Sequence, residues 1–288
     1  MKRCSFSPLS KIEFTQSQTL FKMNRSVVVI ILMLLWTSTQ SATGQELVDS
    51  SRVLRVLSFN IYHGETMNGD FDLEQIAQVI REANPDLVAL QEVDLYTGRN
   101  GGRDLASELG LRTRLIPLFG RSMRFDGGEY GEAILSKSSI LSSRNHALPS
   151  TEGNEPRSAL EVSYIMDSGN TIVFMGTHFD HRGEEDRVRQ ANRVKEILGE
   201  SGLPVLLAGD LNARPESSAM EILFADLKPS DPDFEFTSPS RSPRAKIDYI
   251  LYGPPEHWRV LESRVIHNSV ASDHCAFLSV LELLPADH

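Results

Sequence analysis

The sequence reads Val205-Leu206-Leu207-Ala208-Gly209-Asp210-Leu211-Asn212 at its most informative point, where an apolar run ends in a glycine and two polar residues. A short continuous apolar run bounded by turn residues is typical of a buried strand. We expect this strand to span residues 204–208, so that Asp210 and Asn212 follow its end. Side chains just beyond strand ends in layered α/β folds can converge on one rim, where binding sites form.

Polar residues recur at the ends or starts of other expected strands. They are Asn60, Glu92, His178 with Asp180, Asp248, and Asp273 with His274. Each alone has an ordinary structural reading, such as an ion pair, a turn former or a buried histidine. Together they predict one site, in which three or four carboxylates would repel one another unless a cation neutralised them.

The residue types of this site indicate which cation it prefers. Oxygen-rich ligand sets with few nitrogens and no thiolates select hard cations. We therefore expect Mg²⁺, with Mn²⁺ or Ca²⁺ as alternatives. Zinc is disfavoured, because no His-x-x-x-His pair and no cysteine pair occurs at ligand spacing.

Apolar and β-branched runs alternate with amphipathic segments from residue 53 onward. Expected helices span residues 73–82, 103–109, 184–198 and 216–224. Expected strands span residues 53–61, 87–90, 113–118, 133–135, 140–148, 159–165, 171–178, 204–208, 246–252, 258–266 and 276–283. Short turns between the later strands favour antiparallel hairpins. With no internal repeat or low-complexity linker, we expect one α/β (α+β) domain of two packed sheets covered by helices.

The first 44 residues have the pattern of a signal peptide. An apolar run at residues 27–36 follows Arg25 and precedes small and polar residues that end at Gly44. This run is shorter than the ~20 residues that span a bilayer. We expect cleavage after Gly44 and export of residues 45–288, to a periplasm or out of the cell, with no membrane span. Met23 is an alternative start codon, and an uncleaved membrane anchor is the alternative to cleavage.

The expected exported domain is strongly acidic. Residues 1–44 hold five of the 29 Lys and Arg residues and one of the 39 Asp and Glu residues, so the rest of the chain has a net charge of −14. Such a field repels polyanions, and proteins that coat nucleic acid are usually basic. Nucleic acid is therefore possible but disfavoured as a substrate, although a bound metal ion can reverse the field within the site.

Two cysteines occur, and Cys4 lies in the segment expected to be removed. Cys275 alone remains, so no disulfide can form within the exported domain. Because Cys275 precedes an apolar strand, we expect a buried structural thiol and not a nucleophile.

Six short strings occur in a fixed order along the chain. They are Leu57-Ser58-Phe59-Asn60-Ile61, Leu90-Gln91-Glu92-Val93, Gly176-Thr177-His178-Phe179-Asp180, Ala208-Gly209-Asp210-Leu211-Asn212, Lys246-Ile247-Asp248-Tyr249-Ile250 and Ser272-Asp273-His274. This series resembles the successive motifs of the endonuclease/exonuclease/phosphatase superfamily, the deoxyribonuclease I-like fold, and in particular its secreted bacterial members. The resemblance runs from about residue 53 to residue 283. It implies a four-layer sandwich, two packed mixed β-sheets flanked by helices, and metal-assisted hydrolysis of a phosphate ester.

The resemblance also implies roles for the matching carboxylates and amides. Glu92 resembles the main metal ligand, with Asn60 beside it and Asp273 contributing. Asp210, oriented by Asn212, resembles the group that positions or deprotonates the attacking water.

The histidines match phosphate-facing residues of the family. His274, held by Asp248, resembles the residue that binds or protonates the phosphoryl group, and His178 resembles the second phosphate-facing histidine. A histidine near its ordinary pKa of ~6.5 exchanges protons at neutral pH, and a carboxylate partner fixes its tautomer and stabilises the imidazolium.

Three further residues are weaker candidates for contact with the substrate phosphate. Many relatives have Asn where this chain has Glu132, which is predicted either to pair with His178 and raise its pKa, as in the nuclease branch, or to be a solvated residue at a strand end. Arg157 resembles an arginine of secreted bacterial members that could clamp a phosphate, and a structural ion pair is the alternative. Asp180, with His181, could add a second metal or phosphate contact.

These features specify the reaction type better than the substrate, because function depends on loops grafted onto the fold. A phosphatase or phosphodiesterase acting on a small or lipid-derived phosphoester fits the acidic surface and short loops, and no aromatic hairpin for entering a membrane is evident. A secreted endonuclease or exonuclease on DNA or RNA is the first alternative, and a non-catalytic binding module is the second. Basic stretches at residues 97–103 and 121–124 could bind a phosphate or be solvated turns. No obligate protein partner is evident.

Overall fold

Two mixed six-stranded sheets form the centre of the computed structural model, which describes residues 48–285. The first sheet has the order β11 (Trp258–Ile266), β12 (Ala276–Leu283), β1 (Val53–Asn60), β2 (Leu87–Leu95), β4 (Gly128–Ser136) and β3 (Ile116–Phe125). The second has the order β5 (Ile140–Ala147), β6 (Ser158–Ile165), β7 (Thr171–His178), β8 (Val205–Asp210), β10 (Asp248–Gly253) and β9 (Lys228–Pro229). Four α-helices accompany them within the described residues: α2 (Leu73–Ala83), α3 (Leu105–Thr113), α4 (Glu184–Gly199) and α5 (Ser218–Phe224).

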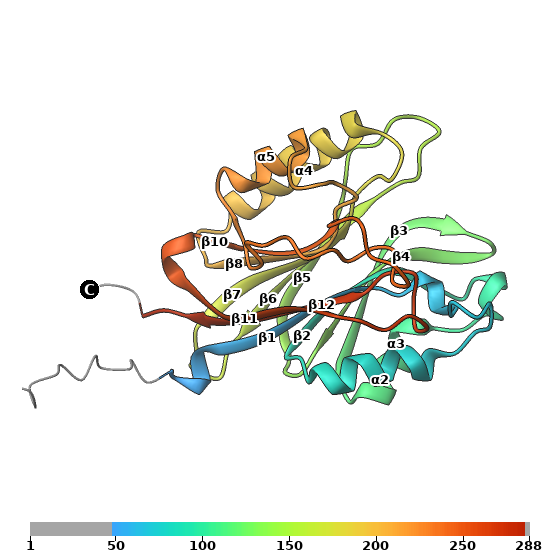
Figure 1. Cartoon of the computed structure of the whole chain (residues 1–288), viewed down its shortest axis with the longest axis horizontal. Coiled ribbons are helices and arrows are strands. Elements are labelled where there is room, and N and C mark those ends of the chain that lie inside the picture. The colour runs from blue at the N-terminus through green and yellow to red at the C-terminus, as the bar shows by residue number, and fades with distance from the viewer. Residues whose placement is uncertain (1–47, 286–288) are drawn as a thin grey trace, which may run out of the picture. The chain divides into compact units, whose positions relative to one another are not determined.

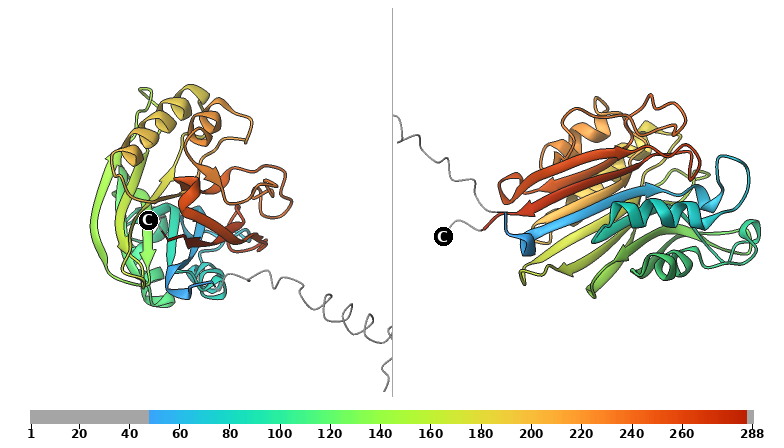
Figure 2. Two further views of the ribbon diagram at one scale, coloured as in Figure 1. Left: turned by 90° about the vertical axis from the view of Figure 1, so that its left-hand side faces the viewer. Right: turned by 60° about the horizontal axis from the view of Figure 1, so that its bottom comes forward.

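The sheets and helices stack as four layers (Figure 1). Helices α2 and α3 cover the outer face of the first sheet, and α4 and α5 cover the outer face of the second. The two further views show the sheets lying against each other between these helices (Figure 2). The predicted four-layer sandwich of two packed mixed sheets is therefore confirmed.

Helix α2 illustrates how the sequence produces the outer layers. Its apolar residues recur at helical spacing, and Leu73, Ile76 and Ile80 are buried against the first sheet. The Asp72 side chain accepts a hydrogen bond from the backbone N–H of Glu74 and so caps the first turn. The helix ends at a residue in the left-handed conformation, Asn84, with φ of 46°.

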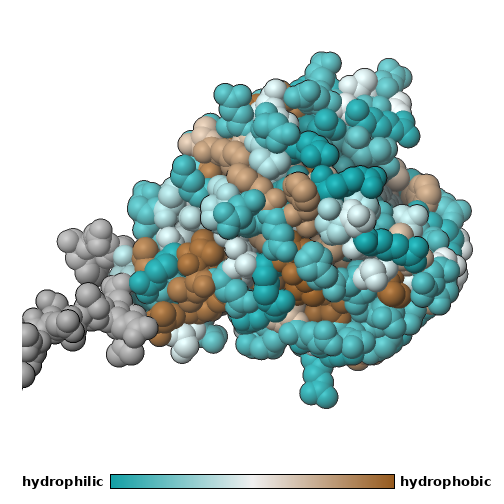
Figure 3. Space-filling view, viewed as in Figure 1, coloured by the Kyte–Doolittle hydropathy of each residue, from teal (hydrophilic) through white to brown (hydrophobic). Residues whose placement is uncertain are grey.

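Apolar side chains from both sheets fill the space between them. Leu54, Ile134, Phe174, Ile250 and Phe277 belong to this central core and are almost fully buried. Polar residues cover most of the visible surface, and its apolar areas are separate patches (Figure 3). This burial supplies the main driving force for packing the sheets, at roughly 25 cal/mol per Å² of apolar surface removed from water.

Strand directions bring residues far apart in the sequence to one edge of the sandwich. β1 runs parallel to β2, and β7 runs parallel to β8, so the carboxyl ends of each pair lie together. β10 is antiparallel to β8, and its first residue, Asp248, pairs with Asp210. β12 is antiparallel to β1, so the Asp273-His274 segment before it lies near the end of β1.

The expected strand at residues 113–118 was largely wrong. Helix α3 continues to Thr113, and β3 begins at Ile116 and runs to Phe125. β3 pairs with β4 through a turn at Asp126 and Gly127, which both have positive φ, as a two-residue hairpin requires. Because β3 is an edge strand with several polar and exposed residues, its apolar signal is weak.

Residues 1–47 lie outside the described residues, and the predicted signal peptide lies among them. Residues 48–285 belong to one compact unit. In this part of the chain no helix is both long and apolar enough to cross a membrane.

Candidate active site

A cavity of about 290 Å³ opens at the edge where β1, β2, β7 and β8 bring their polar residues together. It is lined by His63, Glu92, Arg99, Met123, Phe125, Tyr130, Glu155, Arg157, His178, His181, Asp210, Asn212 and His274. Five of the predicted site residues therefore line it directly: Glu92, His178, Asp210, Asn212 and His274. Arg157, a weaker candidate, lines it too.

Glu92 enters the site through an irregularity in β2. The pairing of β2 with β4 shifts between Leu90 and Val93, and Glu92 has a φ of 60°. Such a bulge re-aims a side chain within a strand, and strained backbone of this kind clusters at functional sites. The expected strand ended before Glu92, whereas β2 continues to Leu95 beyond the bulge.

Asn60 links Glu92 to Asp210. Its Nδ2 donates to Glu92 Oε1 at 3.0 Å and lies 3.2 Å from Asp210 Oδ2. His63 Nδ1 lies 3.5 Å from the other Glu92 oxygen. Burial alone would raise the pKa of Glu92, but the neighbouring His63, His178, Asn60 and His274 lower it to about 2. Glu92 is therefore a carboxylate at neutral pH.

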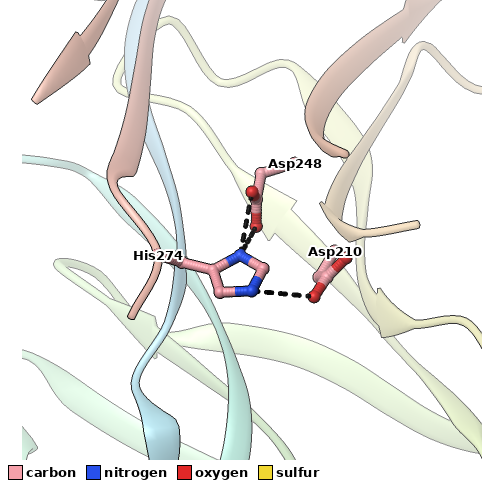
Figure 4. A group of neighbouring side chains, drawn as sticks. All are labelled: Asp210, Asp248 and His274. Atoms are coloured by element: carbon pink, nitrogen blue, oxygen red, sulfur yellow. Dashed lines mark hydrogen bonds and ion pairs between the residues drawn. The ribbon is translucent and has the colours of Figure 1, made fainter. Parts of the chain in front are cut away.

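Asp248, His274 and Asp210 form a row of hydrogen-bonding groups (Figure 4). His274 Nδ1 lies 3.1 and 3.0 Å from the two Asp248 oxygens, and His274 Nε2 faces Asp210 Oδ2 at 3.7 Å. The backbone N–H of Asn212 donates to Asp210 Oδ1 at 2.9 Å, which fixes the carboxylate from its other side. All three residues of the row are buried.

Both Asp210 and His274 have pKa values that are raised by their surroundings. Burial and the charge of Asp248 raise the pKa of Asp210 to about 7, against the lowering effect of His274. Burial would lower the pKa of His274, but the charges of Asp248 and Asp210 raise it well above its ordinary value. At neutral pH the row therefore holds an imidazolium between two acidic groups.

His178 approaches the same Asp210 oxygen, Oδ2, as His274. Its Nε2 lies 2.9 Å from Asn212 Nδ2 and 3.4 Å from Asp210 Oδ2, and Arg157 Nη1 lies 3.0 Å from its Nδ1. Burial and the positive charge of Arg157 lower the pKa of His178 well below its ordinary value. His178 is therefore neutral, in contrast to His274.

The predicted pairing of Glu132 with His178 was wrong. Glu132 is fully buried in β4, and neither carboxyl oxygen has a hydrogen-bond partner in the described part of the chain. The pKa of His178 is lowered and not raised, because the ring contacts the Arg157 guanidinium instead. Burial, with Glu92 and Asp210 nearby, raises the pKa of Glu132 well above its ordinary value despite the charge of Arg157. The alternative of a solvated strand-end residue was also wrong.

The other two weaker candidates have partners within the protein. Asp180 Oδ1 accepts hydrogen bonds from the backbone N–H groups of Arg182 and Gly183, just before α4, and Asp180 does not line the cavity. Arg157 is 2% exposed and pairs with Glu155 at 3.0 Å in addition to His178. Its guanidinium also lies 3.3 Å from the ring of His181. These contacts match the predicted structural ion pair for Arg157, and they give Asp180 a turn-forming role in place of a phosphate contact.

The oxygen donors at this edge fit a hard cation. Glu92 and Asp273 supply carboxylate oxygens, the ligand type that Mg²⁺ and Ca²⁺ prefer, and the amide oxygen of Asn60 accepts a hydrogen bond from the Tyr62 backbone N–H at 3.1 Å. Burial and the negative charge of Glu92 raise the pKa of Asp273, a repulsion that a cation between them would relieve. Asp210, Asp248 and His274 also have ligand atoms within 4.8 Å of one another, but His274 Nδ1 already contacts both Asp248 oxygens.

Several cavity residues were missed as specific site residues, among them the titratable or charged His63 and Arg99. His63 follows Asn60 by three positions, and the 3-10 turn η2 (Tyr62–Gly64) directs it back toward Glu92. The sequence signal for His63 was a polar residue followed by glycine directly after a strand end. Gly64 has a φ of 87°, a conformation that favours glycine. Arg99 lies in the basic stretch 97–103, for which the sequence predicted either a phosphate contact or a solvated turn, and its side chain lines the cavity.

Cys275 is buried, and burial raises the pKa of its thiol to about 11. A thiol that is protonated and enclosed is a poor nucleophile. The expected buried structural thiol agrees with this environment.

A sequence profile of the Endonuclease/Exonuclease/phosphatase family matches residues 57–274, most of the chain. The chain belongs to this family. Its members hydrolyse phosphoester bonds, and the matched span includes every residue of the site described above. For an endonuclease/exonuclease/phosphatase family protein, the four-layer sandwich and the polar strand ends are expected features.

Solved structures share this architecture. The endonuclease/exonuclease/phosphatase protein of Beutenbergia cavernae DSM 12333 is 23% identical, with a TM-score of 0.69 over 81% of this chain and 72% of that one. A mannosyl-6-phosphatase from Bacteroides thetaiotaomicron VPI-5482 is 21% identical, with a TM-score of 0.65 over 81% of this chain and 100% of that one. The protein cwh43 of Schizosaccharomyces pombe is 26% identical over 164 residues, 55% of this chain. This chain matches 17% of the length of that relative.

Proposed function

We propose that this chain is a divalent-metal-dependent hydrolase that acts, as a phosphatase or phosphodiesterase, on a small or lipid-derived phosphoester. One observation carries the proposal: a carboxylate of raised pKa, a charged histidine and a neutral histidine converge on a cavity of about 290 Å³ beside oxygen donors for a cation. Phosphoester hydrolysis needs an in-line nucleophile and neutralisation of the charge on the phosphoryl oxygens, which these groups supply together.

Asp210 is proposed to position the attacking water and to accept its proton. A pKa of about 7 suits a general base at neutral pH, because the group is partly deprotonated yet basic enough to take a proton. The Asn212 N–H and the Asn60 amide hold one oxygen each, so the carboxylate has a fixed orientation.

His274 and His178 are proposed to contact the phosphoryl group from different sides with different charges. His274, charged and held by Asp248, donates a hydrogen bond to a phosphoryl oxygen or a proton to the leaving oxygen. His178, held neutral by burial and Arg157, orients the group without adding charge.

A divalent cation at Glu92, Asn60 and Asp273 would neutralise charge on the phosphate oxygens. Mg²⁺ is the proposed ion, with Mn²⁺ or Ca²⁺ as alternatives, because the donors are oxygens. Glu92, a carboxylate at neutral pH, is the principal ligand in this arrangement.

The choice of a small substrate rests on the cavity and the charge of the whole domain. The cavity lies just below the ~300–1,000 Å³ of pockets for drug-sized ligands. The net charge of −14 for residues 45–288 opposes the approach of a polynucleotide. A fold neighbour that is a mannosyl-6-phosphatase adds support for a small phosphoester.

A secreted nuclease is the second candidate, because the family of this chain includes endonucleases and exonucleases. The acidic surface and the small cavity weigh against this candidate.

Hydrolysis by residues 45–288 of a substrate panel tests the proposal. The panel holds p-nitrophenyl phosphate, bis-p-nitrophenyl phosphate, inositol phosphates, sphingomyelin, RNA and supercoiled DNA, each with Mg²⁺, Mn²⁺, Ca²⁺ or EDTA. Metal-dependent release from a small or lipid ester without DNA nicking is expected. Nicking of DNA with no turnover of the small esters would favour the nuclease instead.

We also propose that residues 1–44 direct export and are then removed. The composition of residues 25–44 supports this, with an apolar run between Arg25 and Gly44. N-terminal sequencing of the protein recovered from outside the cytoplasm should begin at Gln45. Recovery of the whole chain in the cytoplasmic fraction would contradict export.

A further inference from the structure

Arg99 presents a rigid guanidinium to the cavity. Its Nε and Nη2 donate to the two Asp94 oxygens at 2.6 and 2.7 Å, a bidentate pair that fixes the plane of the group. Asp94 is fully buried and also accepts a hydrogen bond from Thr97 Oγ1 at 2.7 Å. A group held this way loses little freedom when it binds a ligand, which favours selective recognition.

The guanidinium also covers two aromatic rings of the β3–β4 hairpin. Its central carbon lies 4.7 Å from the ring centre of Phe125 and 5.6 Å from that of Tyr130. A ring face occupied by a cation is not free to stack on a nucleobase. The cavity therefore meets hydrogen-bond donors on this wall in place of an aromatic surface, although Phe125 itself is 37% exposed.

One edge of the guanidinium is available to a ligand. Within residues 48–285, Arg99 Nη1 makes no hydrogen bond, and the side chain is 30% exposed. Arg157, the other cavity arginine, is 2% exposed, and both of its terminal nitrogens contact His178, His181 or Glu155. Arg99 is thus the cavity arginine with a terminal nitrogen left for substrate.

The remaining walls are mostly polar. Glu155 is 25% exposed and offers carboxylate oxygens, whereas the Nδ1 and Nε2 atoms of His181 already contact Arg157 and Arg182. Met123 and Phe125 are the apolar residues of the lining. Such a wall favours an alcohol group that both donates and accepts hydrogen bonds, and it disfavours an acyl chain.

We propose that Arg99 is a specificity-determining residue that donates from Nη1 to hydroxyl groups of the substrate alcohol, so that the preferred substrate is the phosphate ester of a small polyol. This inference rests on the proposed function, with the phosphate at Asp210 and His274 and the alcohol toward Arg99. Sugars and cyclitols share this chemistry, and the experiment separates them.

The test compares esters that differ in their hydroxyl groups. The kcat/KM of residues 45–288 with Mg²⁺ is measured for glucose 6-phosphate and for n-hexyl phosphate, a primary ester of six carbons without further hydroxyls. A preference for the sugar ester of roughly tenfold to 100-fold is expected, the effect of a charge-assisted hydrogen bond. An inositol monophosphate forms the cyclitol arm, and the faster of the two polyol esters identifies the source.

Variants assign the preference to Arg99. Arg99→Met keeps an unbranched stem over the rings but loses every donor, and it should reduce the preference by about tenfold or more. Arg99→Lys, with one charged donor group, should retain more of the preference than methionine. Arg121→Met is the matched control, because Arg121 lies on the β3–β4 hairpin whose rings Arg99 covers, pairs with Glu129 and does not line the cavity.

Each outcome separates this inference from the proposed function. Hydrolysis of both esters at equal kcat/KM would overturn the role of Arg99 and leave the proposed function standing. A preference that Arg99→Met and Arg99→Lys leave unchanged would do the same. No hydrolysis of any phosphoester, with any of the three metals, would overturn the proposed function and this inference with it. The preference of the unaltered protein decides the substrate class even if neither variant folds.

Discussion

Asp210 is the side chain on which the proposed chemistry depends most. It contacts Asn60, faces His178 and His274, and has a pKa raised to about 7 by burial and Asp248. Asp210→Asn keeps the shape but cannot accept the proton of water. We expect kcat to fall roughly 10²–10⁴-fold, the usual contribution of a positioned base.

A matched substitution distinguishes loss of chemistry from loss of fold. Asp86→Asn is the matched substitution. Asp86 directly precedes β2, at the end of the strand away from Glu92, and its side chain accepts a hydrogen bond from the Arg55 N–H. This substitution should leave kcat within about twofold while changing the unfolding temperature at least as much as Asp210→Asn. Equal activity in the two variants would remove Asp210 from the mechanism.

Polar residues at or next to the ends and starts of strands were the ones that sequence could place. Asp210, Asn212, His178 and His274 follow or precede apolar runs, and the sheet topology brings them together. Arg99 and Glu132 were harder, because their roles depend on contacts across the fold. Glu132 belongs to a strand pattern that gives no sign of its full burial, and Arg99 is held at the cavity by Asp94 and by its stacking on Phe125.

At the scale of elements, helix α4 holds the loop that precedes Arg157. Asp186 on α4 accepts hydrogen bonds from Thr151 N, Thr151 Oγ1 and Asn154 Nδ2, and it also pairs with Arg189. Gln190, one turn later, donates to the carbonyl of Pro149. The start of this loop is thus held by side chains of a single helix.

Asp186→Asn tests this anchor through its pH dependence. Burial alone would raise the pKa of Asp186, but the hydrogen bonds from Thr151, Asn154 and Arg189 lower it well below its ordinary value. A lowered pKa contributes stability above the unfolded pKa of ~3.9, and this stability is lost as pH falls through the folded pKa. We expect the variant to lose about 2 kcal/mol of unfolding free energy at pH 7.

Urea unfolding at pH 7 and pH 3 measures the effect of that substitution. The difference in unfolding free energy between the original protein and Asp186→Asn should be smaller at pH 3, because Asp186 of the original protein takes up a proton in the unfolded state at that pH. A difference that is the same at both pH values would show that the charge of Asp186 contributes nothing.

Two glycines of the second sheet, Gly209 and Gly176, should differ strongly in how well they tolerate an added methyl group. A Cβ on Gly209 would lie 2.0 Å from the Thr177 carbonyl oxygen, which is backbone and cannot move freely. A Cβ on Gly176 would lie 3.2 Å from the Ala89 side chain of the facing sheet. We expect Gly209→Ala to cost more than about 4 kcal/mol, or to prevent folding, and Gly176→Ala to cost about 1–3 kcal/mol. Soluble yield and thermal unfolding rank the two, and a milder effect at Gly209 would contradict the packing described for β8.

Fold class was readable from the sequence because the apolar runs of the central strands are continuous. The hairpin of β3 and β4 was not, since β3 is an edge strand with several exposed and polar residues and one buried residue. The bulge at Glu92 was also hidden, because a residue with φ of 60° leaves no mark when it is not glycine or asparagine.

For the whole molecule, charge and metal binding are linked. The domain has a net charge of −14 and buries several carboxylates at one edge. A cation that binds there in the folded state, and not in the unfolded state, stabilises the fold. Mg²⁺ should therefore raise the unfolding temperature of residues 45–288 by a few degrees. Glu92→Gln should abolish this rise, whereas Glu108→Gln, which alters a surface ion pair with Arg103, should keep it. An equal rise in both variants would place the cation elsewhere.

Hydrolysis of p-nitrophenyl phosphate and bis-p-nitrophenyl phosphate by residues 45–288, with Mg²⁺ and with EDTA, is the most direct test of the central claim. We predict turnover of at least one ester with Mg²⁺, its loss with EDTA, and a fall of roughly 10²-fold or more with Mg²⁺ in Asp210→Asn. Turnover that survives EDTA, or that Asp210→Asn leaves undiminished, would contradict a metal-dependent phosphoester hydrolase built on this site.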